Sequence, residues 1–167
     1  AYPKTEWATW ANRILYDAEH LMPGMKAPSF DVTSIQGETV ALDSLRGKYV
    51  PVEFYVPGQR EFLEELPLRS ALVHAADERD FEIISISLES DPRVNKAFLE
   101  NFEFPGTLAF LPGGLQSSVA SWYNVRALPK RILVDRQGNI VSNYEGPYMR
   151  AIIQEMSVLF AREGQQG

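Results

Sequence analysis

Short runs of β-forming residues alternate with segments of helical periodicity from residue 50 onward, and this alternation limits the fold more than any other feature of the sequence. Segments that alternate in this way pack as a sheet covered by helices. The expected strands are 50–56, 81–88, 107–111, 131–135 and 139–144, and the expected helices are 59–77, 92–102, 116–123 and 148–163. We therefore predict an α/β fold with a mixed central sheet flanked by helices.

Two short extended runs precede this region and predict an N-terminal β-hairpin. The runs cover residues 29–33 and 39–42, and turn-forming residues at 35–38 separate them. Pro51, in the strand that follows, is an irregularity. Because proline has no backbone N–H, it must occupy a strand position that needs no ladder hydrogen bond.

An extra amphipathic helix is expected ahead of the hairpin. Apolar residues recur at helical spacing over residues 5–22, and Pro23 and Gly24 end the pattern. We expect Trp7 and Trp10, on its apolar face, to pack on the domain that follows. The alternative is that the two tryptophans form a dimer or partner surface.

The composition is that of one globular domain. The chain has 167 residues, of which 45% are apolar and 23% charged, so it is long enough to bury a core. We divide it into an N-terminal amphipathic helix at residues 1–22, a main domain at 23–163 and a tail at 164–167.

The absence of cysteine narrows the possible chemistry. Without cysteine there are no disulfides, no thiolate metal ligands and no cysteine nucleophile. The histidines, His20 and His74, have no neighbours at ligand spacing. We therefore expect neither a metal nor a cofactor.

The charge pattern argues against nucleic acid and membrane partners. The net charge is −6, and basic residues are scattered apart from Lys130 and Arg131. No run approaches the roughly 18 apolar residues of a membrane-spanning helix. We therefore expect no nucleic-acid partner and no membrane-spanning segment, while the oligomeric state stays open.

Several short motifs occur in an order that is specific when they are taken together. Residues 54–67 read FYVPGQREFLEELP. The other matching positions are Gly24, Ala27, Pro28, Phe30, Gly37, Val40, Leu42, Leu45, Arg46, Gly47, Lys48, Tyr123, Val125, Pro129, Asp135, Gly138 and Gly146. Over about residues 24–160 the chain resembles the thioredoxin-like family of cell-envelope disulfide reductases of the TlpA and ResA type, and more distantly the peroxiredoxins. The resemblance implies a thioredoxin-like fold.

The chain departs from this family at the residues that carry its chemistry. Aligned on the family's C-x-x-C motif, Gln59 and Phe62 replace the two cysteines. Thiol–disulfide exchange needs a thiolate and a resolving thiol, so neither replacement can carry electrons. The Thr-x-x-Cys signature of peroxiredoxins is also missing. The chain therefore keeps the sequence motif around the redox site but lacks the cysteines that carry its chemistry.

Two acidic residues remain near the former redox positions. The resemblance implies that Glu53 and Glu65 match carboxylates that assist proton transfer to the buried thiol in redox relatives. Two neighbouring acids with shifted pKa values could support general acid–base catalysis. Alternatively, Glu53 is satisfied by a neighbouring donor and Glu65 is solvated on its helix.

Pro129 matches the cis-proline of the family. If the Leu128–Pro129 bond is cis, the resemblance implies a backbone surface beside residues 59–62 on which an extended peptide can align. Lys130, with Arg131 and Arg60, would add positive character that favours acidic peptides or small anions; alternatively, these side chains point to solvent and have no specific anion role. The expected binding residues are Gln59, Arg60, Phe62, Glu65, Leu128, Pro129 and Lys130.

These observations predict a redox-inactive thioredoxin-like domain that binds a protein or peptide. By family resemblance, we expect it in the cell envelope or periplasm. One alternative is a non-redox enzyme that uses Glu53 and Glu65. Another is a structural accessory module of a larger envelope protein, in which the helix at 5–22 packs on the missing part.

Overall fold

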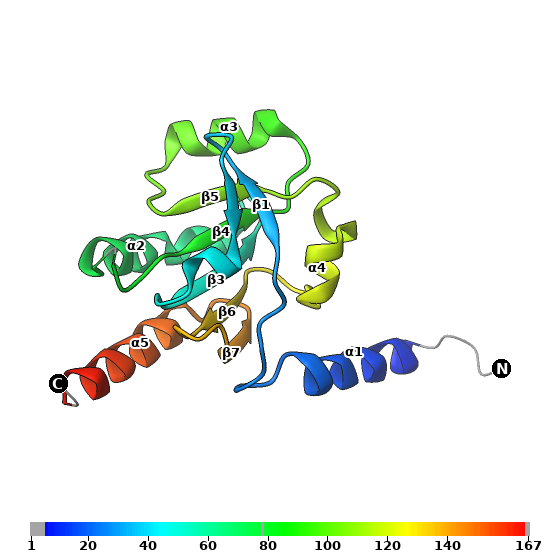
Figure 1. Cartoon of the computed structure of the whole chain (residues 1–167). Helices are drawn as coiled ribbons and strands as arrows, with labels where there is room; N and C mark the ends of the chain where they lie inside the picture. The colour runs from blue at the N-terminus through cyan, green and yellow to red at the C-terminus, as the bar shows by residue number, and fades with distance from the viewer. Residues whose placement is uncertain (1–5, 78, 166–167) are drawn as a thin grey trace.

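The central feature of the computed structural model, which describes residues 6–77 and 79–165, is a seven-stranded mixed sheet (Figure 1). Its strand order is β2-β1-β5-β4-β3-β6-β7. The strands are β1 Asp31–Ser34, β2 Thr39–Ala41, β3 Val50–Tyr55, β4 Ile84–Ser87, β5 Thr107–Phe110, β6 Lys130–Val134 and β7 Ile140–Glu145. The mixed sheet and the N-terminal hairpin of β1 and β2 confirm the predicted architecture.

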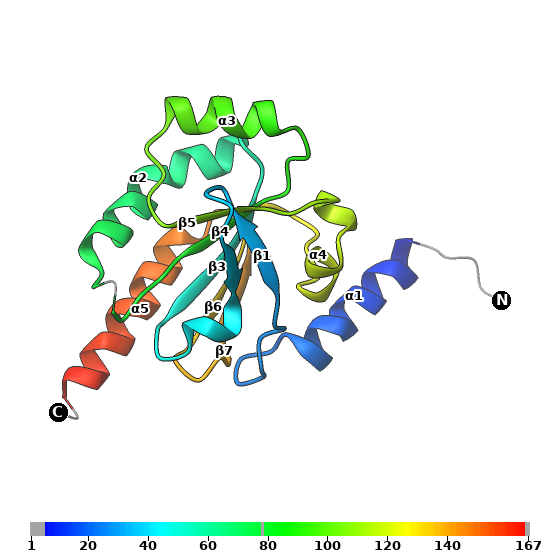
Figure 2. The ribbon, with the colours of Figure 1, turned by 45° about the horizontal axis from the view of Figure 1, so that its top comes forward.

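The helices complete the alternation expected from the sequence. The α-helices are α1 Glu6–His20, α2 Arg60–Ala75, α3 Pro92–Asn101, α4 Ser118–Trp122 and α5 Met149–Gly164, and the 3₁₀ helices are η1 Leu42–Leu45 and η2 Gly114–Gln116. Figures 1 and 2 show α2, α3 and α5 against one face of the sheet and α4 against the other. Among the described residues, no helix combines the length and the apolar character needed to cross a membrane.

Strand β3 lies in the centre of the sheet and separates the two cores. It runs parallel to β4 and antiparallel to β6. Val52 and Phe54 contribute to the core on the α4 side, whereas Tyr55 packs with residues of α2 and α3. Because successive side chains of a strand point to opposite faces, Glu53 also faces the α2 side. All six residues of β3 are buried, so its polar residues need partners inside the protein.

Pro51 occupies a position that tolerates the missing donor. The regular pairing of β3 with β4 begins at Val52, and an isolated bridge joins Tyr49 to Phe81 before it. Pro51 lies between these two pairings, so its missing N–H falls in an interruption of the ladder. The irregularity in the sequence thus has a local structural explanation.

Helix α1 differs from the expectation for its two tryptophans. Trp7 is 77% exposed and Trp10 is 55% exposed, so the prediction that they pack on the following domain was wrong. Helix α1 has no buried residue, and its N-terminal half extends away from the sheet (Figure 1). Helix α5 continues through Gly164, while residues 166–167 of the predicted tail lie outside the described residues.

Candidate functional site

The segment after β3 meets the loop before β6 at the former redox position. Gln59 immediately precedes α2, and its Nε2 donates a hydrogen bond to the Leu128 carbonyl oxygen at 2.5 Å. The Leu128–Pro129 peptide bond is cis, which meets the condition set by the sequence. Two segments far apart in the chain are therefore joined by the side chain that replaces the first cysteine.

The backbone N–H and carbonyl groups of Leu128 are only partly hydrogen-bonded. Its carbonyl accepts from Gln59, but its N–H has no hydrogen bond within the described residues. A carbonyl oxygen has two lone pairs, so the Leu128 oxygen retains room for a second donor. The Gln59 Oε1 atom is buried and unpaired. This loop therefore offers one free donor and one shared acceptor to an extended chain.

Phe62 lies inside the protein rather than on this surface. Its ring is fully buried and stacks on Tyr55, with ring centroids 4.4 Å apart and an interplanar angle of 17°. Phe98 and Phe104 complete an aromatic cluster around it. The expected surface role of Phe62 therefore does not fit its position, because the ring fills core space at the place of the resolving thiol.

Glu53 is the centre of a buried polar network on the same side of the sheet. One carboxylate oxygen accepts from Arg69 Nε at 3.1 Å and from the Ser85 hydroxyl at 2.9 Å. The other oxygen accepts from Arg131 Nε at 2.6 Å. The two arginine side chains and Glu53 are at most 1% exposed. Each carboxylate oxygen is therefore already occupied by donors from the protein.

Glu65 extends this network to two helices. It receives a hydrogen bond from Arg131 Nη1 at 2.6 Å and another from the backbone N–H of Met149 at 2.7 Å. Met149 is the first residue of α5. The N–H groups in the first turn of a helix have no partner within that helix. Glu65 thus caps α5 while it is paired with β6, and the expectation that it is solvated was wrong.

This network fixes the charge of Glu53. Burial raises the pKa of its carboxyl, but Arg131 and Arg69 outweigh burial and hold that pKa below its ordinary value of 4.5. The charges of Glu53 and Glu65 balance those of the two arginines. A carboxylate with no exposure and no proton to donate is poorly suited to general acid–base work. The geometry therefore favours the interpretation in which Glu53 is satisfied by neighbouring donors.

The expected positive surface is also absent from this part of the described structure. Lys130 and Arg131 are fully buried, and Lys130 pairs with Glu145 at 3.3 Å. Burial lowers the pKa of Lys130, and Glu145 opposes that shift. Arg60 is exposed but pairs with Glu64 at 2.8 Å. Lys130 and Arg131 therefore add no positive charge to the surface, because each neutralises a carboxylate of the same chain.

The remaining surface is smaller than the set expected from sequence. Of the expected binding residues, Arg60 is exposed and Gln59 and Leu128 are half-buried. The side chains of Phe62, Glu65, Pro129 and Lys130 are buried beneath them. These buried residues can support the surface, but they do not form it.

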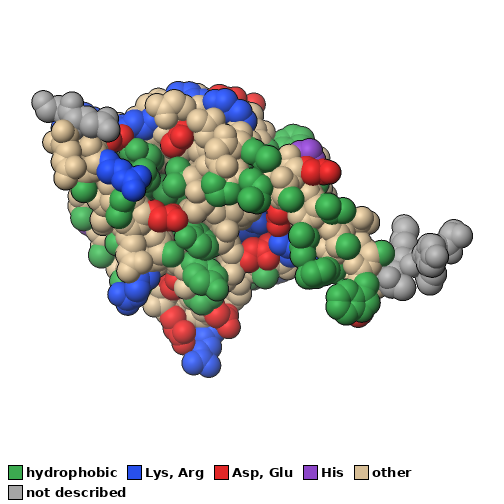
Figure 3. Space-filling model, turned by 90° about the horizontal axis from the view of Figure 1, so that it is seen from below, with side chains coloured by type: hydrophobic (Ala, Val, Ile, Leu, Met, Phe, Trp, Pro, Cys, Tyr) green, Lys and Arg blue, Asp and Glu red, His purple; other side chains and the backbone are tan. Residues whose placement is uncertain are grey.

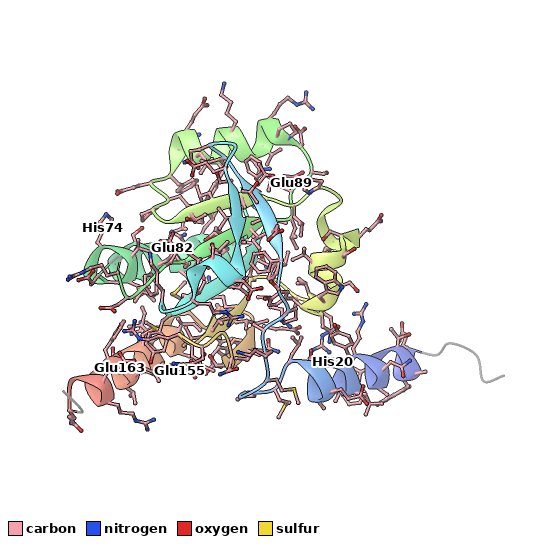
Figure 4. All side chains as sticks on the ribbon, viewed as in Figure 1. His20, His74, Glu82, Glu89, Glu155 and Glu163 are labelled. Atoms are coloured by element: carbon pink, nitrogen blue, oxygen red, sulfur yellow. The ribbon has the colours of Figure 1, made fainter. Side chains whose placement is uncertain are left out.

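No metal centre emerges from the acidic and histidine residues. Among residues 6–77 and 79–165, no three histidine, aspartate or glutamate side chains group closely enough to hold a metal ion. His20 on α1 and His74 on α2 lie on separate parts of the molecule (Figure 4). Both are exposed.

Arg69 is the site residue that the sequence interpretation missed. It lies four residues after Glu65 on the same side of α2, next to the apolar positions of that helix. A charged residue on an apolar helix face was therefore the available signal. Its guanidinium also donates to the Pro105 carbonyl at 2.7 Å and lies 3.7 Å above the Phe104 ring.

Solved structures with the same fold identify the class of protein. The chain aligns with the thioredoxin domain of a thiol-disulfide oxidoreductase from Bacteroides vulgatus with a TM-score of 0.72 and 25% identity, covering 81% of this chain and 98% of that one. It also aligns with the exposed lipoprotein thioredoxin of Streptococcus pneumoniae with a TM-score of 0.66 and 20% identity, covering 78% and 98% of the two chains. The fold and the position of Gln59 and Phe62 define a thioredoxin-like protein without cysteines.

The family follows from sequence. The model of the AhpC/TSA family matches residues 23–146, and the chain belongs to that family. The chain is similar to the thiol-disulfide oxidoreductase ResA of Bacillus cereus, with 27% identity over 130 residues that cover 78% of this chain and 73% of the relative. A second ResA, from Halalkalibacterium halodurans, is 25% identical over 157 residues, which are 93% of this chain and 86% of the relative.

Proposed function

We propose that this chain is a redox-inactive member of the AhpC/TSA family that binds an extended segment of a protein or peptide. The observation that carries the proposal is the junction of Gln59 with Leu128, in which the frame of a redox site is kept without sulfur. The loop is present, but the two cysteines of the redox motif are not. Because function depends on the groups present in a site, this arrangement favours a role in binding.

Main-chain pairing is the expected mode of recognition. The free N–H of Leu128 can donate to a carbonyl of the bound segment, and the Leu128 oxygen can accept a second hydrogen bond. Extended peptides bind exposed backbone edges in this way, and neighbouring side chains then select the sequence. Arg60 and the half-buried Leu128 side chain are the nearest candidates for that selection.

We do not propose acid–base catalysis by Glu53 and Glu65. Glu53 and Glu65 hold arginines and a helix N-terminus, and Glu53 has no exposed surface. A general acid or base must reach its substrate within hydrogen-bond distance or through one water molecule. The geometry therefore favours binding over the alternative of a non-redox enzyme that uses these two carboxylates.

A backbone methylation series tests the mode of binding. A peptide selected on the immobilised chain from a random display library is measured by fluorescence anisotropy, and each of its backbone N–H groups is then methylated in turn. We expect at least a fivefold loss of affinity at the residue that pairs with Leu128, since one lost main-chain hydrogen bond that leaves its partner unsatisfied costs about 1–3 kcal/mol. Equal affinity across the whole series would overturn main-chain pairing at this loop.

A redox assay tests the other half of the proposal. The purified chain is incubated with insulin and dithiothreitol, and precipitation of the reduced insulin is followed. We expect the rate to equal that of dithiothreitol alone, because the chain holds no thiol. Faster reduction that co-purifies with the chain would contradict the proposal.

The cell envelope is the proposed location. The support is the resemblance to cell-envelope disulfide reductases. Fractionation of the source cells, with the native chain detected by antibody, checks this location. Recovery of the chain with the cytosolic markers would contradict it.

A further inference from the structure

Helix α1 is attached to the rest of the protein by its polar side. Asp17 accepts from Arg126 and from Asn124, each at 2.8 Å, and Tyr16 donates to the Trp122 carbonyl at 3.0 Å. The Asn124 side chain also donates to a backbone carbonyl of α1 at 2.9 Å. An amphipathic helix normally turns its apolar side toward the core. Here the polar side makes the contacts.

The apolar side of α1 is left in solvent. A helix has 3.6 residues per turn, so Trp7, Ala11, Ile14 and Ala18 share one side that lies opposite Tyr16. Ile14 is 41% exposed and Leu15 is 56% exposed, in addition to the two exposed tryptophans. Figure 3 views the molecule from below, where hydrophobic side chains gather over α1 at the right. We call Trp7, Trp10, Ile14 and Leu15 the α1 strip.

The charged residues beside the α1 strip can pair with the same residues on a second copy of the chain. Glu6 and Arg13 lie two helical turns apart along the same flank of the strip, and neither forms an ion pair within the described residues. In an antiparallel pair of α1 helices with a twofold axis near Thr9 and Trp10, Glu6 of each copy faces Arg13 of the other. A twofold interface repeats each contact, so this flank supplies the same ion pair twice.

The position and area of the strip also suit self-association. Helix α1 lies at the edge of the molecule, and its N-terminal half is clear of the sheet and its covering helices (Figure 2). With about 150–250 Å² per aromatic side chain, the strip offers roughly 500 Å² per copy. Two copies then bury about 1,000 Å², the lower end of specific interfaces.

A lipid surface fits the same strip less well. Interfacial helices carry Lys and Arg on their polar face, whereas α1 has one arginine, no lysine and three acidic residues. The whole chain carries a net charge of −6, which opposes binding to anionic lipid. The charges around α1 therefore favour a second copy of this chain over a lipid surface.

We propose that the α1 strip is the interface of a homodimer in which two α1 helices pair antiparallel through Trp7 and Trp10. The proposal is independent of peptide binding at Leu128, because it concerns a different surface. An interface at the lower end of the size range predicts a weak dimer that dissociates on dilution.

Sedimentation velocity over a range of concentrations tests the homodimer with the full chain. The double variant W7E/W10E is expected to stay monomeric, while V158E, a control at an exposed valine of α5, is expected to dimerise as the native chain does. Tryptophan emission should shift to shorter wavelength as the native chain is concentrated, since the dimer buries Trp7 and Trp10.

A charge exchange separates a second copy from other occupants. In R13E, the new glutamate at position 13 of each copy faces Glu6 of the other, which should weaken the dimer at least threefold. E6R/R13E should restore the dimer, because each ion pair is rebuilt with its charges exchanged. A native chain that remains monomeric into the millimolar range would overturn the proposal. So would a shift of tryptophan emission with phosphatidylcholine vesicles in a monomeric chain, which would assign the strip to lipid.

Discussion

The carboxylate of Glu53 lies between two guanidinium groups, so its charge is set by fixed neighbours rather than by solvent. A buried charge is tolerable only when it is paired and its hydrogen-bonding capacity is filled. Arg69, Arg131 and Ser85 satisfy both conditions for Glu53. At the residue scale, Glu53 therefore belongs to a buried ion-pair network that stabilises the folded chain.

Glu53→Gln should strongly destabilise the protein. The substitution leaves Arg69 and Arg131 without a full counter-charge, and breaking a buried pair in this way costs about 3–5 kcal/mol. Denaturation by urea measures the free energy of unfolding. Glu64→Gln, which removes the exposed partner of Arg60, is the matched control and should change that free energy little. Equal effects of both variants would contradict the assigned role of Glu53.

The same carboxylate predicts a pH dependence of stability. The pKa of Glu53 is lower in the folded chain than its ordinary value of 4.5, so the unfolded chain takes up its proton first as the pH falls. Stability from this group is present above pH 4.5 and is lost as the pH falls through the folded pKa. Denaturation between pH 6 and about pH 2 should therefore show a smaller acid-side loss in Glu53→Gln than in the native chain. Identical slopes would contradict the depressed pKa.

Phe62 makes a separate prediction at the residue scale. Phe62→Ala empties a fully buried position in the aromatic cluster and should cost about 3–5 kcal/mol of unfolding free energy. Leu115→Ala, at a leucine that is 57% exposed, is the control and should be nearly neutral. A small effect of Phe62→Ala would mean that the ring is a surface group, as the sequence had suggested.

At the scale of elements, the polar network joins helices to the sheet. Glu65 on α2 contacts Arg131 on β6 and the first N–H of α5, and Arg69 on α2 contacts Glu53 on β3. Arg69 also reaches the carbonyl of Pro105, just before β5. The loop before β5 therefore packs closely against the network, and a side chain at Gly106 would have little room.

Gly106→Ala tests that close approach. An added Cβ would lie 2.5 Å from the Ile83 Cγ2 atom, and the φ of +100° disfavours an L residue. We expect a loss of more than about 1 kcal/mol, seen as a lower Tm by circular dichroism. Gly164→Ala, at a helical glycine with open space around it, is the control and should be neutral or slightly stabilising. A Tm for Gly106→Ala equal to that of the control would contradict the tight packing.

At the scale of the whole molecule, the order of strands and helices was predictable from local patterns, whereas the partners of charged residues were not. The alternation after Val50 and the turns between elements depend on neighbours in sequence, so they are readable from it. The burial of Lys130 and the pairing of Arg131 with Glu53 depend on which strands are adjacent in the sheet. Helical periodicity likewise located the apolar side of α1, but the long-range bonds of Asp17 turn that side outward.

The candidate site was predicted in position and only partly in composition. The motif order predicted that Gln59 lies beside the Leu128–Pro129 bond, and the hydrogen bond from Gln59 to the Leu128 carbonyl joins these two segments. The motif could not distinguish residues that form the surface from those beneath it. That distinction depends on the depth of Phe62 and Glu65 in the packed core, which is a property of the folded chain.

An amide-resolved NMR titration of the ¹⁵N-labelled chain with a display-selected peptide tests whether Leu128 binds an extended segment. We expect the Leu128 amide to move downfield as its N–H gains an acceptor, with smaller changes at the Gln59 side-chain amide and at the Arg60 backbone amide. The amides of α1 should remain unchanged. Binding that shifts other amides and leaves Leu128 and Gln59 unaffected would show that the peptide does not bind at this loop.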